Sequence, residues 1–300
     1  AVRADGRLIG CGLAWQWGRE QGSIGMVIVD DAWQRRGIGK RLFSGLLQAL
    51  QGRDVMLQAT TQGRPLYESL GFSAIGHARQ FHGHWQPPAE AGPTSSIATD
   101  ELTRLLQPQD LPALLAYDQR ERGLVRPELL QALLAQMDAD ERCAVSVDAH
   151  GRLCGYGILR RFGRGWVVGP LLADGADRAV ALVKRLTQER AGDFVRIDLA
   201  ADTRAFPASH SHSHSHAQAQ AQAQAQASHN RPSAQGHGYD ADILADWLQA
   251  HGLAPVDQPT TMIRPAASRP DTDAHTGNGP QSTPQAHTAT VCALAAQALG

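Results

Sequence analysis

The stretch that decides the fold is Gly25-Met26-Val27-Ile28-Val29-Asp30-Asp31-Ala32-Trp33-Gln34-Arg35-Arg36-Gly37-Ile38-Gly39-Lys40. Its first part belongs to an apolar run over 24–29, which is typical of a strand buried on both faces. Its last part opens a helix, because apolar residues recur at helical spacing from Ile38 to Leu50 and Gly52 follows as a stop. A buried strand is therefore expected to lead through a glycine-containing turn into an amphipathic helix.

This turn has the composition of a phosphate cradle. Unpaired backbone N–H groups at a helix start converge on one spot, and the helix dipole adds positive potential there. Glycines at 37 and 39 let the main chain approach a bulky anion, and the surrounding basic residues are Arg35, Arg36, Lys40 and Arg41. The turn is not a Walker loop, since no Gly-Lys-Ser/Thr follows, and it lacks the dinucleotide G-x-G-x-x-G spacing. A tight turn beside a solvated basic face is the alternative.

Elements on both sides of the turn build a first α/β unit over residues 1–86. The expected order is a hairpin over 1–16, the strand 24–29, the helix 38–50, a strand over 55–59, a short helix over 66–70 and a final strand or pair of strands over 72–81. Residues 87–100 are rich in Pro, Ala, Gly, Ser and Thr, which predicts a linker.

Residues 101–265 repeat this plan, so a second, similar unit is expected. The hairpin over 142–159 matches the first hairpin, and the helix over 176–188 matches the helix after the turn. A strand and two helices precede the second hairpin without a counterpart in the first unit, which we therefore expect to be incomplete at its N-terminus. Ser-His and Ala-Gln repeats predict a disordered insertion over 207–238. The composition of 266–300 predicts a disordered tail, in which 289–299 is a candidate for a small helix.

Two motifs resemble those of one enzyme family. Gln34-x-x-Gly37-x-Gly39 resembles the Q/R-x-x-G-x-G/A loop of the GNAT superfamily of acyl-CoA-dependent N-acyltransferases, and Tyr67-Glu68-Ser69-Leu70-Gly71-Phe72 resembles its Y-E-x-x-G-F motif. The whole arrangement is similar to bacterial tandem acetyltransferases with a divergent second unit. The resemblance implies an α/β (α+β) fold of two GNAT-like units, each a mixed, mostly antiparallel sheet flanked by helices.

The resemblance also implies which residues bind the acyl donor, acetyl-CoA. The strand before the loop would splay from its neighbour and pair with the pantetheine arm, a backbone N–H near Ile28 would polarise the thioester carbonyl, and the loop amides would hold the pyrophosphate. The expected donor-binding residues are Val27, Ile28, Val29, Gln34, Arg35, Arg36, Gly37, Ile38, Gly39 and Lys40.

Tyr67 stands where the family commonly places a general acid that protonates the departing CoA thiolate. A phenol with a pKa near 10 stays protonated at neutral pH, which suits that task; a core aromatic with one hydrogen bond is the alternative. The reaction would be direct attack of a neutral amine in a ternary complex, without a covalent enzyme intermediate. Candidates for the base that removes the amine proton are Glu20, Asp30, Glu68, His82 and His84. Trp15, Trp17 and Trp85 are candidates for an acceptor pocket, with an exposed position or core packing as the alternatives.

The second unit departs from the family at its strand-to-helix turn over 169–178. The Q/R-x-x-G-x-G pattern is absent there, and Asp174 and Asp177 would repel a pyrophosphate. We therefore expect this unit not to bind CoA, but to pack against the first unit or help to shape the acceptor site.

The composition limits the remaining functions. A net charge of -1 predicts no nucleic-acid partner and no membrane partner, and four cysteines without zinc-site spacing predict no metal and a reducing, cytoplasmic setting. The expected partner is a small-molecule or peptide amine, with a homodimer left open. One alternative function is a regulatory module that binds acyl-CoA without turnover. Another is metal binding by alternating histidines over 210–216.

Overall fold

The computed structural model describes residues 1–88, 102–201, 236–266 and 290–294. Its N-terminal elements are β1 (Val2–Ala4), β2 (Arg7–Trp17), β3 (Gln21–Val29), the 3-10 helix η1 (Asp31–Trp33), α1 (Ile38–Ala49), β4 (Asp54–Ala59), α2 (Arg64–Ser69) and β5 (Ser73–His84). The later elements are β6 (Thr103–Leu105), η2 (Pro108–Asp110), α4 (Leu111–Arg122), α5 (Pro127–Ala135), β7 (Arg142–Val147), β8 (Leu153–Phe162), β9 (Gly165–Asp174), α6 (Ala176–Thr187), β10 (Phe194–Ala201), α8 (Gly236–Ala250), β11 (Leu253–Asp257), β12 (Thr260–Arg264) and β13 (Thr290–Leu294).

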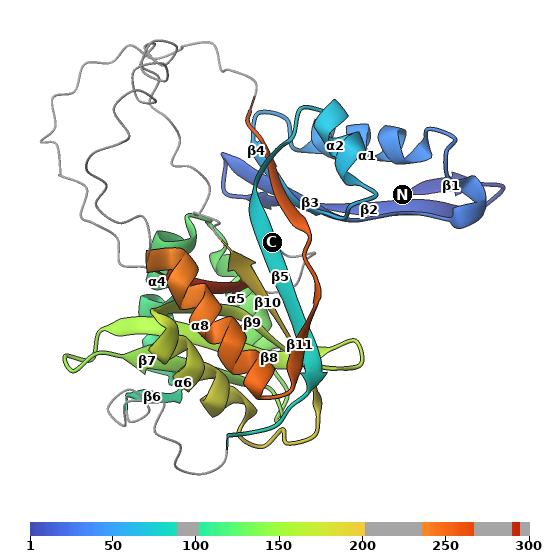
Figure 1. Cartoon of the computed structure of the whole chain (residues 1–300). Coiled ribbons are helices and arrows are strands. Elements are labelled where there is room, and N and C mark those ends of the chain that lie inside the picture. The colour runs from blue at the N-terminus through green and yellow to red at the C-terminus, as the bar shows by residue number, and fades with distance from the viewer. Residues whose placement is uncertain (89–101, 202–235, 267–289, 295–300) are drawn as a thin grey trace, which may run out of the picture.

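The described strands join into one mixed sheet in the order β1-β2-β3-β4-β12-β5-β10-β13-β9-β8-β7-β6, with β11 beside β5. All pairings are antiparallel except β3–β4 and β9–β10. Helices flank the sheet, and α1 and α2 lie over the N-terminal strands in Figure 1. This is the predicted fold class, a mostly antiparallel sheet covered by helices.

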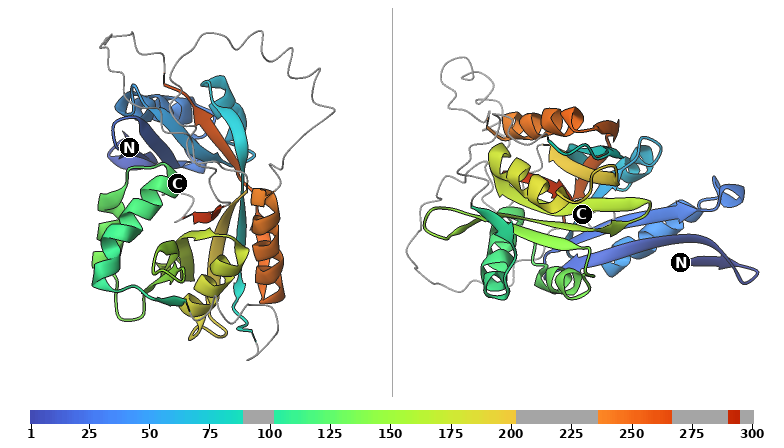
Figure 2. Two further views of the ribbon diagram at one scale, coloured as in Figure 1. Left: turned by 90° about the vertical axis from the view of Figure 1, so that its left-hand side faces the viewer. Right: turned by 90° about the horizontal axis from the view of Figure 1, so that it is seen from below.

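Two strands are exchanged between the halves of the sheet. Strand β12 comes late in the chain, yet it inserts between β4 and the first part of β5, residues 73–77. The second part of β5 inserts in turn between β10 and β11. Figure 1 and Figure 2 show β5 and the β11–β12 segment as neighbouring strands that connect the two halves. We call β1–β4, β12 and the first part of β5 the N-terminal half-sheet, and the remaining strands the C-terminal half-sheet.

The exchanged strand β12 is buried among N-terminal residues. Met262 is fully buried in one core cluster with Phe43 and Leu57, which lie on α1 and β4. On the opposite side, Ile263 clusters with Met56 and with Leu124 of the α4–α5 connection. Removing a buried Met side chain typically costs about 2–5 kcal/mol, so β12 is an integral part of the N-terminal half-sheet.

The structure corrects two expectations about strands. The run 24–29 is not buried on both faces, because Met26 and Ile28 are 50% and 53% exposed, and only the other face lies under α1. Within the predicted disordered tail, residues 290–294 form strand β13 rather than part of a helix. The reason is tertiary, since the backbone of this segment pairs with β9 and β10.

Other predicted segments lie largely outside the described residues. These are the linker, the insertion and most of the tail. The last three residues of the predicted insertion, 236–238, begin helix α8.

Candidate active site

The first feature of the site is a fork between β3 and β4. These parallel strands pair only from Gln21–Ser23 to Asp54–Met56, although β3 continues to Val29 and β4 to Ala59. Beyond Ser23, no described strand covers the edge of β3 that faces β4. The fork therefore offers main-chain groups of β3 to an extended ligand.

Strand β3 carries a bulge in the part that lies beyond its pairing with β4. Met26 has a φ of 54°, and the pairing with β2 shifts between Cys11 and Leu13 so that β3 carries one extra residue. Bulges of this kind bend a strand and redirect its groups.

Two glycines of β2 let α1 lie close to this strand. A Cβ on Gly12 would come within 2.8 Å of the Leu46 side chain, and a Cβ on Gly10 would come within 3.6 Å of Ile38. Sequence reasoning missed their role, although their i, i+2 spacing in a strand is the signal for close backbone approach. They place the start of α1 next to the end of β3.

The turn between β3 and α1 is held by its own polar groups. The Asp30 carboxylate accepts a hydrogen bond from the Ala32 N–H at 3.0 Å. The Gln34 amide donates to the Val29 carbonyl at 3.3 Å and to the Asp31 carboxylate at 2.7 Å. Gln34 therefore fixes the turn, which explains why a long amide side chain suits this position.

The backbone of the loop then turns sharply. Arg35 and Gly37 both adopt the left-handed region, with φ values of 59° and 76°. The first helical hydrogen bond runs from the Arg41 N–H to the Gly37 carbonyl at 3.0 Å. Within the described part of the chain, the N–H groups of residues 35–40 donate no hydrogen bond to a protein acceptor. Six donors thus gather at the start of α1, where the helix dipole favours an anion.

The space above these amides is open. A Cβ on Gly37 would meet no atom within 4 Å, and a Cβ on Gly39 would meet only a Val29 methyl group at 3.9 Å. Packing therefore does not require glycine at 39, whereas a ligand lying against the main chain would.

Basic side chains surround the same loop. Arg35, Lys40 and Arg41 are exposed and form no ion pair with any described residue. Arg36 lies over the Trp33 ring at 4.9 Å. The loop combines free donors with local positive charge, as a diphosphate site requires.

Tyr67 lies on α2, which connects β4 to β5. Its ring packs against Phe43 and Phe72, with centroid distances of 4.9 and 6.2 Å, and burial raises the pKa of the phenol. Its hydroxyl forms no hydrogen bond with the described residues, unlike a core tyrosine with one internal partner. A Cβ on Gly63 would lie 3.3 Å from that hydroxyl oxygen, which places the hydroxyl near the start of α2.

Most of the predicted base candidates have other contacts. Asp30 caps the turn and lies 3.5 Å from Arg7, while Glu68 binds Arg64 at 2.7 Å. His82 and His84 lie in the part of β5 that pairs with β10, and both rings neighbour Phe194. Glu20 is exposed in the turn between β2 and β3.

The predicted pocket tryptophans belong to the core. Trp17 and Trp85 are 6% and 1% exposed, and Trp15 is a partly buried neighbour of the same cluster as Trp17. The Trp17 indole N–H donates to the Ser23 hydroxyl at 2.9 Å.

The described residues show no group of three or more His, Cys, Asp or Glu side chains arranged to hold a metal ion. Among the helices described, none has the length and apolar character needed to cross a membrane. The alternating histidines over 210–216 lie outside the described residues.

Comparison with known proteins agrees with the family resemblance of the two motifs at residues 34–39 and 67–72. Two models described as an acetyltransferase (GNAT) domain match residues 1–88 and 114–240. The uncharacterized N-acetyltransferase YitH of Bacillus subtilis is 32% identical over 199 residues, which cover 66% of this chain and 67% of that protein. The N-alpha-acetyltransferase RimI of Mycobacterium tuberculosis is 34% identical over 87 residues, or 27% of this chain and 55% of that protein.

Solved structures show the same fold. A putative acetyltransferase from Pyrococcus horikoshii superposes with a TM-score of 0.63 at 18% identity, covering 99% of this chain and 78% of its own. A GCN5-related N-acetyltransferase from Sphaerobacter thermophilus gives a TM-score of 0.56 at 14% identity, covering 88% and 80%.

The two domain matches lie in tandem, and each includes one parallel strand pair of the sheet. This confirms the tandem arrangement predicted from the repeated order of elements. The chain belongs to the GNAT family of acetyltransferases, as its two sequence motifs predict.

Proposed function

We propose that this chain transfers an acetyl group from acetyl-CoA to an amine by direct attack within a ternary complex. The observation that carries the proposal is the set of six amides over 35–40, which donate to no acceptor among the described residues and lie beside the open edge of β3. A diphosphate on the loop and an extended pantetheine arm along β3 would satisfy both sets of donors.

Each loop element has a separate task in this proposal. The amides of residues 35–40 bind the diphosphate oxygens, and Arg35 and Lys40 add charge. The main chain of Val27, Ile28 and Val29 lines the arm, and an N–H at the bulge near Ile28 stabilises negative charge on the thioester oxygen. Gln34 acts indirectly, by holding the turn in shape.

Tyr67 is proposed as the general acid. The amine nitrogen forms a bond to the acetyl carbon while the carbon–sulfur bond breaks, and Tyr67 gives its proton to the departing thiolate. A proton of the attacking nitrogen passes to water, and solvent reprotonates the phenol. Burial raises the pKa of Tyr67 further above neutral pH, so the phenol is protonated there, and among the described residues none accepts a hydrogen bond from its hydroxyl.

The proposal is tested by comparing two donors. S-acetylpantetheine carries the thioester and the arm but lacks the diphosphate, so it should bind much more weakly than acetyl-CoA. Thiol release should be measured for both donors with a panel of amines that includes peptide α-amines, since the relative RimI is named an N-alpha-acetyltransferase. Equal affinities for the two donors would remove the loop from the donor site.

The Tyr67→Phe variant distinguishes a loss of catalysis from a loss of acetyl-CoA binding. The variant should lose most of its thiol release at saturating amine and retain its affinity for acetyl-CoA, because only the hydroxyl is removed. Tight acetyl-CoA binding by the wild type without thiol release for any amine would favour the alternative, a regulatory acyl-CoA-binding module. Unchanged turnover in Tyr67→Phe would reject this residue as the acid.

A further inference from the structure

The sheet contains a second fork with the same geometry as the first. Strands β9 and β10 run parallel and pair only from Trp166–Val168 to Val195–Ile197, after which they separate. The match to β3 and β4 is close, since both forks close over three residues and open toward the start of a helix. The forks differ in their contents.

Strand β13 fills the second fork. Its residues 290–293 pair with Asp174, Ala173, Leu172 and Leu171 of β9, and residues 293 and 294 pair with Leu199 and Asp198 of β10. Both ladders are antiparallel. The fork therefore receives an extended main chain that pairs with both of its edges, which is the geometry of peptide binding by strand addition.

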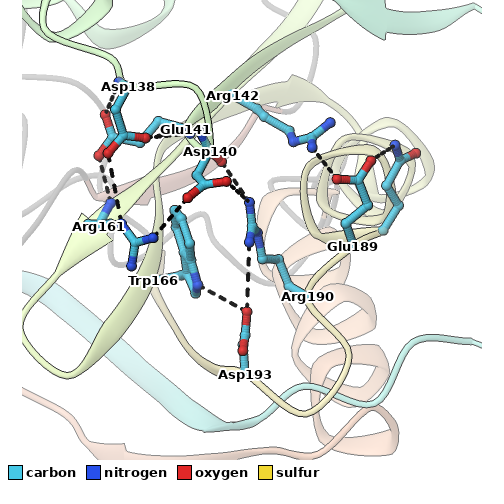
Figure 3. Close-up of polar contacts among 10 residues, drawn as sticks. Asp138, Asp140, Glu141, Arg142, Arg161, Trp166, Glu189, Arg190 and Asp193 are labelled. Carbon is cyan, nitrogen blue, oxygen red and sulfur yellow. Dashed lines mark hydrogen bonds and ion pairs between the residues drawn. The ribbon is translucent and has the colours of Figure 1, made fainter.

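The closed end of this fork is rigidly held (Figure 3). The Trp166 indole N–H donates to Asp193 at 3.1 Å. Arg190 and Arg161 lie over the Trp166 ring at 4.0 and 4.5 Å, and both bind Asp140. These contacts fix the start of β9 relative to the start of β10. None of these contacts involves β13, so the closed end of the fork is held independently of the strand that fills it, as a preformed strand site requires.

The open end is unsuited to a phosphate. Asp174 and Asp177 flank the start of α6, where the first fork has arginines and lysine. The Asp174 carboxylate accepts a hydrogen bond from the Tyr117 hydroxyl at 2.7 Å, and Arg178 donates to the Asp174 carbonyl. Anionic side chains repel a diphosphate but do not hinder a neutral backbone strand.

We propose that the β9/β10 fork is a binding site for an extended peptide strand antiparallel to both neighbours, and that residues 290–294 of this chain occupy it. The C-terminal half-sheet then receives a peptide in the position where the N-terminal half-sheet is proposed to receive an acyl-CoA arm. This site stands independently of the acetyl-transfer proposal, because it rests on backbone pairing in the other half of the sheet.

Cys292→Pro in the full chain tests the site. Cys292 lies in the middle of β13 and pairs with Leu172 of β9. Proline at this position removes the N–H and is poorly tolerated in a strand with neighbours on both sides. Hydrogen exchange should become about tenfold faster or more for amides over 171–174 and 198–199, the scale of one lost net hydrogen bond. Gln281→Pro is the control, because it adds proline to the same tail outside β13. Unchanged exchange over β3 and α1 would show that the variant remains folded.

A synthetic peptide of residues 286–298 provides the second measurement. In the presence of reductant it should bind the Cys292→Pro chain, restore protection over 171–174, and bind the wild-type chain poorly because its site is filled. The same peptide with proline at the position of Cys292 should not bind. Unchanged protection in Cys292→Pro, or no binding of the wild-type peptide to that variant, would overturn the proposal. If the protection over 171–174 in the wild-type protein disappeared on dilution, and the undiluted protein had the mass of a dimer, the strand in the fork would come from a second copy, and occupancy within one chain would be overturned.

Discussion

The proposed diphosphate loop predicts opposite effects of Gly39→Ala on stability and on ligand binding. Gly39 is the second residue of α1, and an added methyl group would meet only Val29, at 3.9 Å. Gly45→Ala is a matched control, because Gly45 is exposed on the same helix, away from the loop, and its Cβ would meet nothing within 4 Å. Both substitutions therefore add a methyl group without a clash.

The expected magnitudes follow from helix propensity. Glycine in a helix interior costs about 0.8–1.0 kcal/mol relative to alanine. Gly45→Ala should gain roughly that amount, and Gly39→Ala should gain less because it lies in the first turn. A gain of about 1 kcal/mol raises the melting temperature by roughly 2–4 °C in a chain of this size class. Neither variant should lose stability.

Binding should separate the two variants. A methyl group at Gly39 would occupy the space in which a diphosphate contacts the amides, so acetyl-CoA affinity should fall about tenfold or more, equivalent to ~1.4 kcal/mol. Gly45→Ala should leave the affinity unchanged. Thermal unfolding and calorimetric titration with acetyl-CoA and S-acetylpantetheine measure both effects, and only acetyl-CoA should be weakened. An intact acetyl-CoA affinity in Gly39→Ala would refute the placement of the diphosphate on these amides.

Three further predictions use the perturbed groups. Burial raises the pKa of Tyr67 above its ordinary value of 10.0. The contribution of the neutral phenol to the free energy of unfolding is therefore complete below pH 10 and is lost as the pH rises further. Turnover should decrease above pH 10 in the wild type, and this decrease should be absent in Tyr67→Phe. Arg126→Met removes the two hydrogen bonds of 2.8 and 2.9 Å and the positive charge that Arg126 gives the buried Asp118 carboxylate, which keeps its hydrogen bond from the Tyr156 hydroxyl. Chemical denaturation should show a loss of about 3–5 kcal/mol, and a loss below 1 kcal/mol would contradict this. Burial raises the pKa of Cys143 to about 12, so iodoacetamide at pH 8 should label the partly exposed Cys11 before Cys143. Equal labelling of these two cysteines in the native protein would contradict the packing.

The sequence allowed prediction of the features that depend on neighbouring residues. The loop over 34–39 and the Tyr67 motif are local, because a strand, a turn and a helix start follow one another within sixteen residues. The role of the glycine at 37 could be predicted for the same reason, because the turn itself requires a left-handed φ at this position. The exposure of one face of β3 could not be predicted, because an apolar residue such as Met26 or Ile28 is compatible both with a covered face and with an exposed one.

Long-range pairing explains the remaining errors. Residues 290–294 have a composition compatible with helix or strand, and the free edges of β9 and β10 decide between them. The insertion of β12 between β4 and β5 could not be predicted for the same reason. Nothing local in Thr260–Arg264 indicates that the partners of this strand are β4 and β5.

The strand exchange has a consequence for the active site itself. Strands β4 and β5 do not pair with each other, and β12 pairs with both of them. The helix that carries Tyr67 connects those same two strands, and Met262 of β12 lies in the core cluster that includes Phe43 and Phe72, the ring neighbours of Tyr67. The position of the proposed acid relative to β3 is therefore set by a strand that follows it by almost 200 residues. Residues 1–86 contain the proposed loop and the proposed acid but lack β12, the strand that aligns them, so residues 1–86 alone should not form a working site.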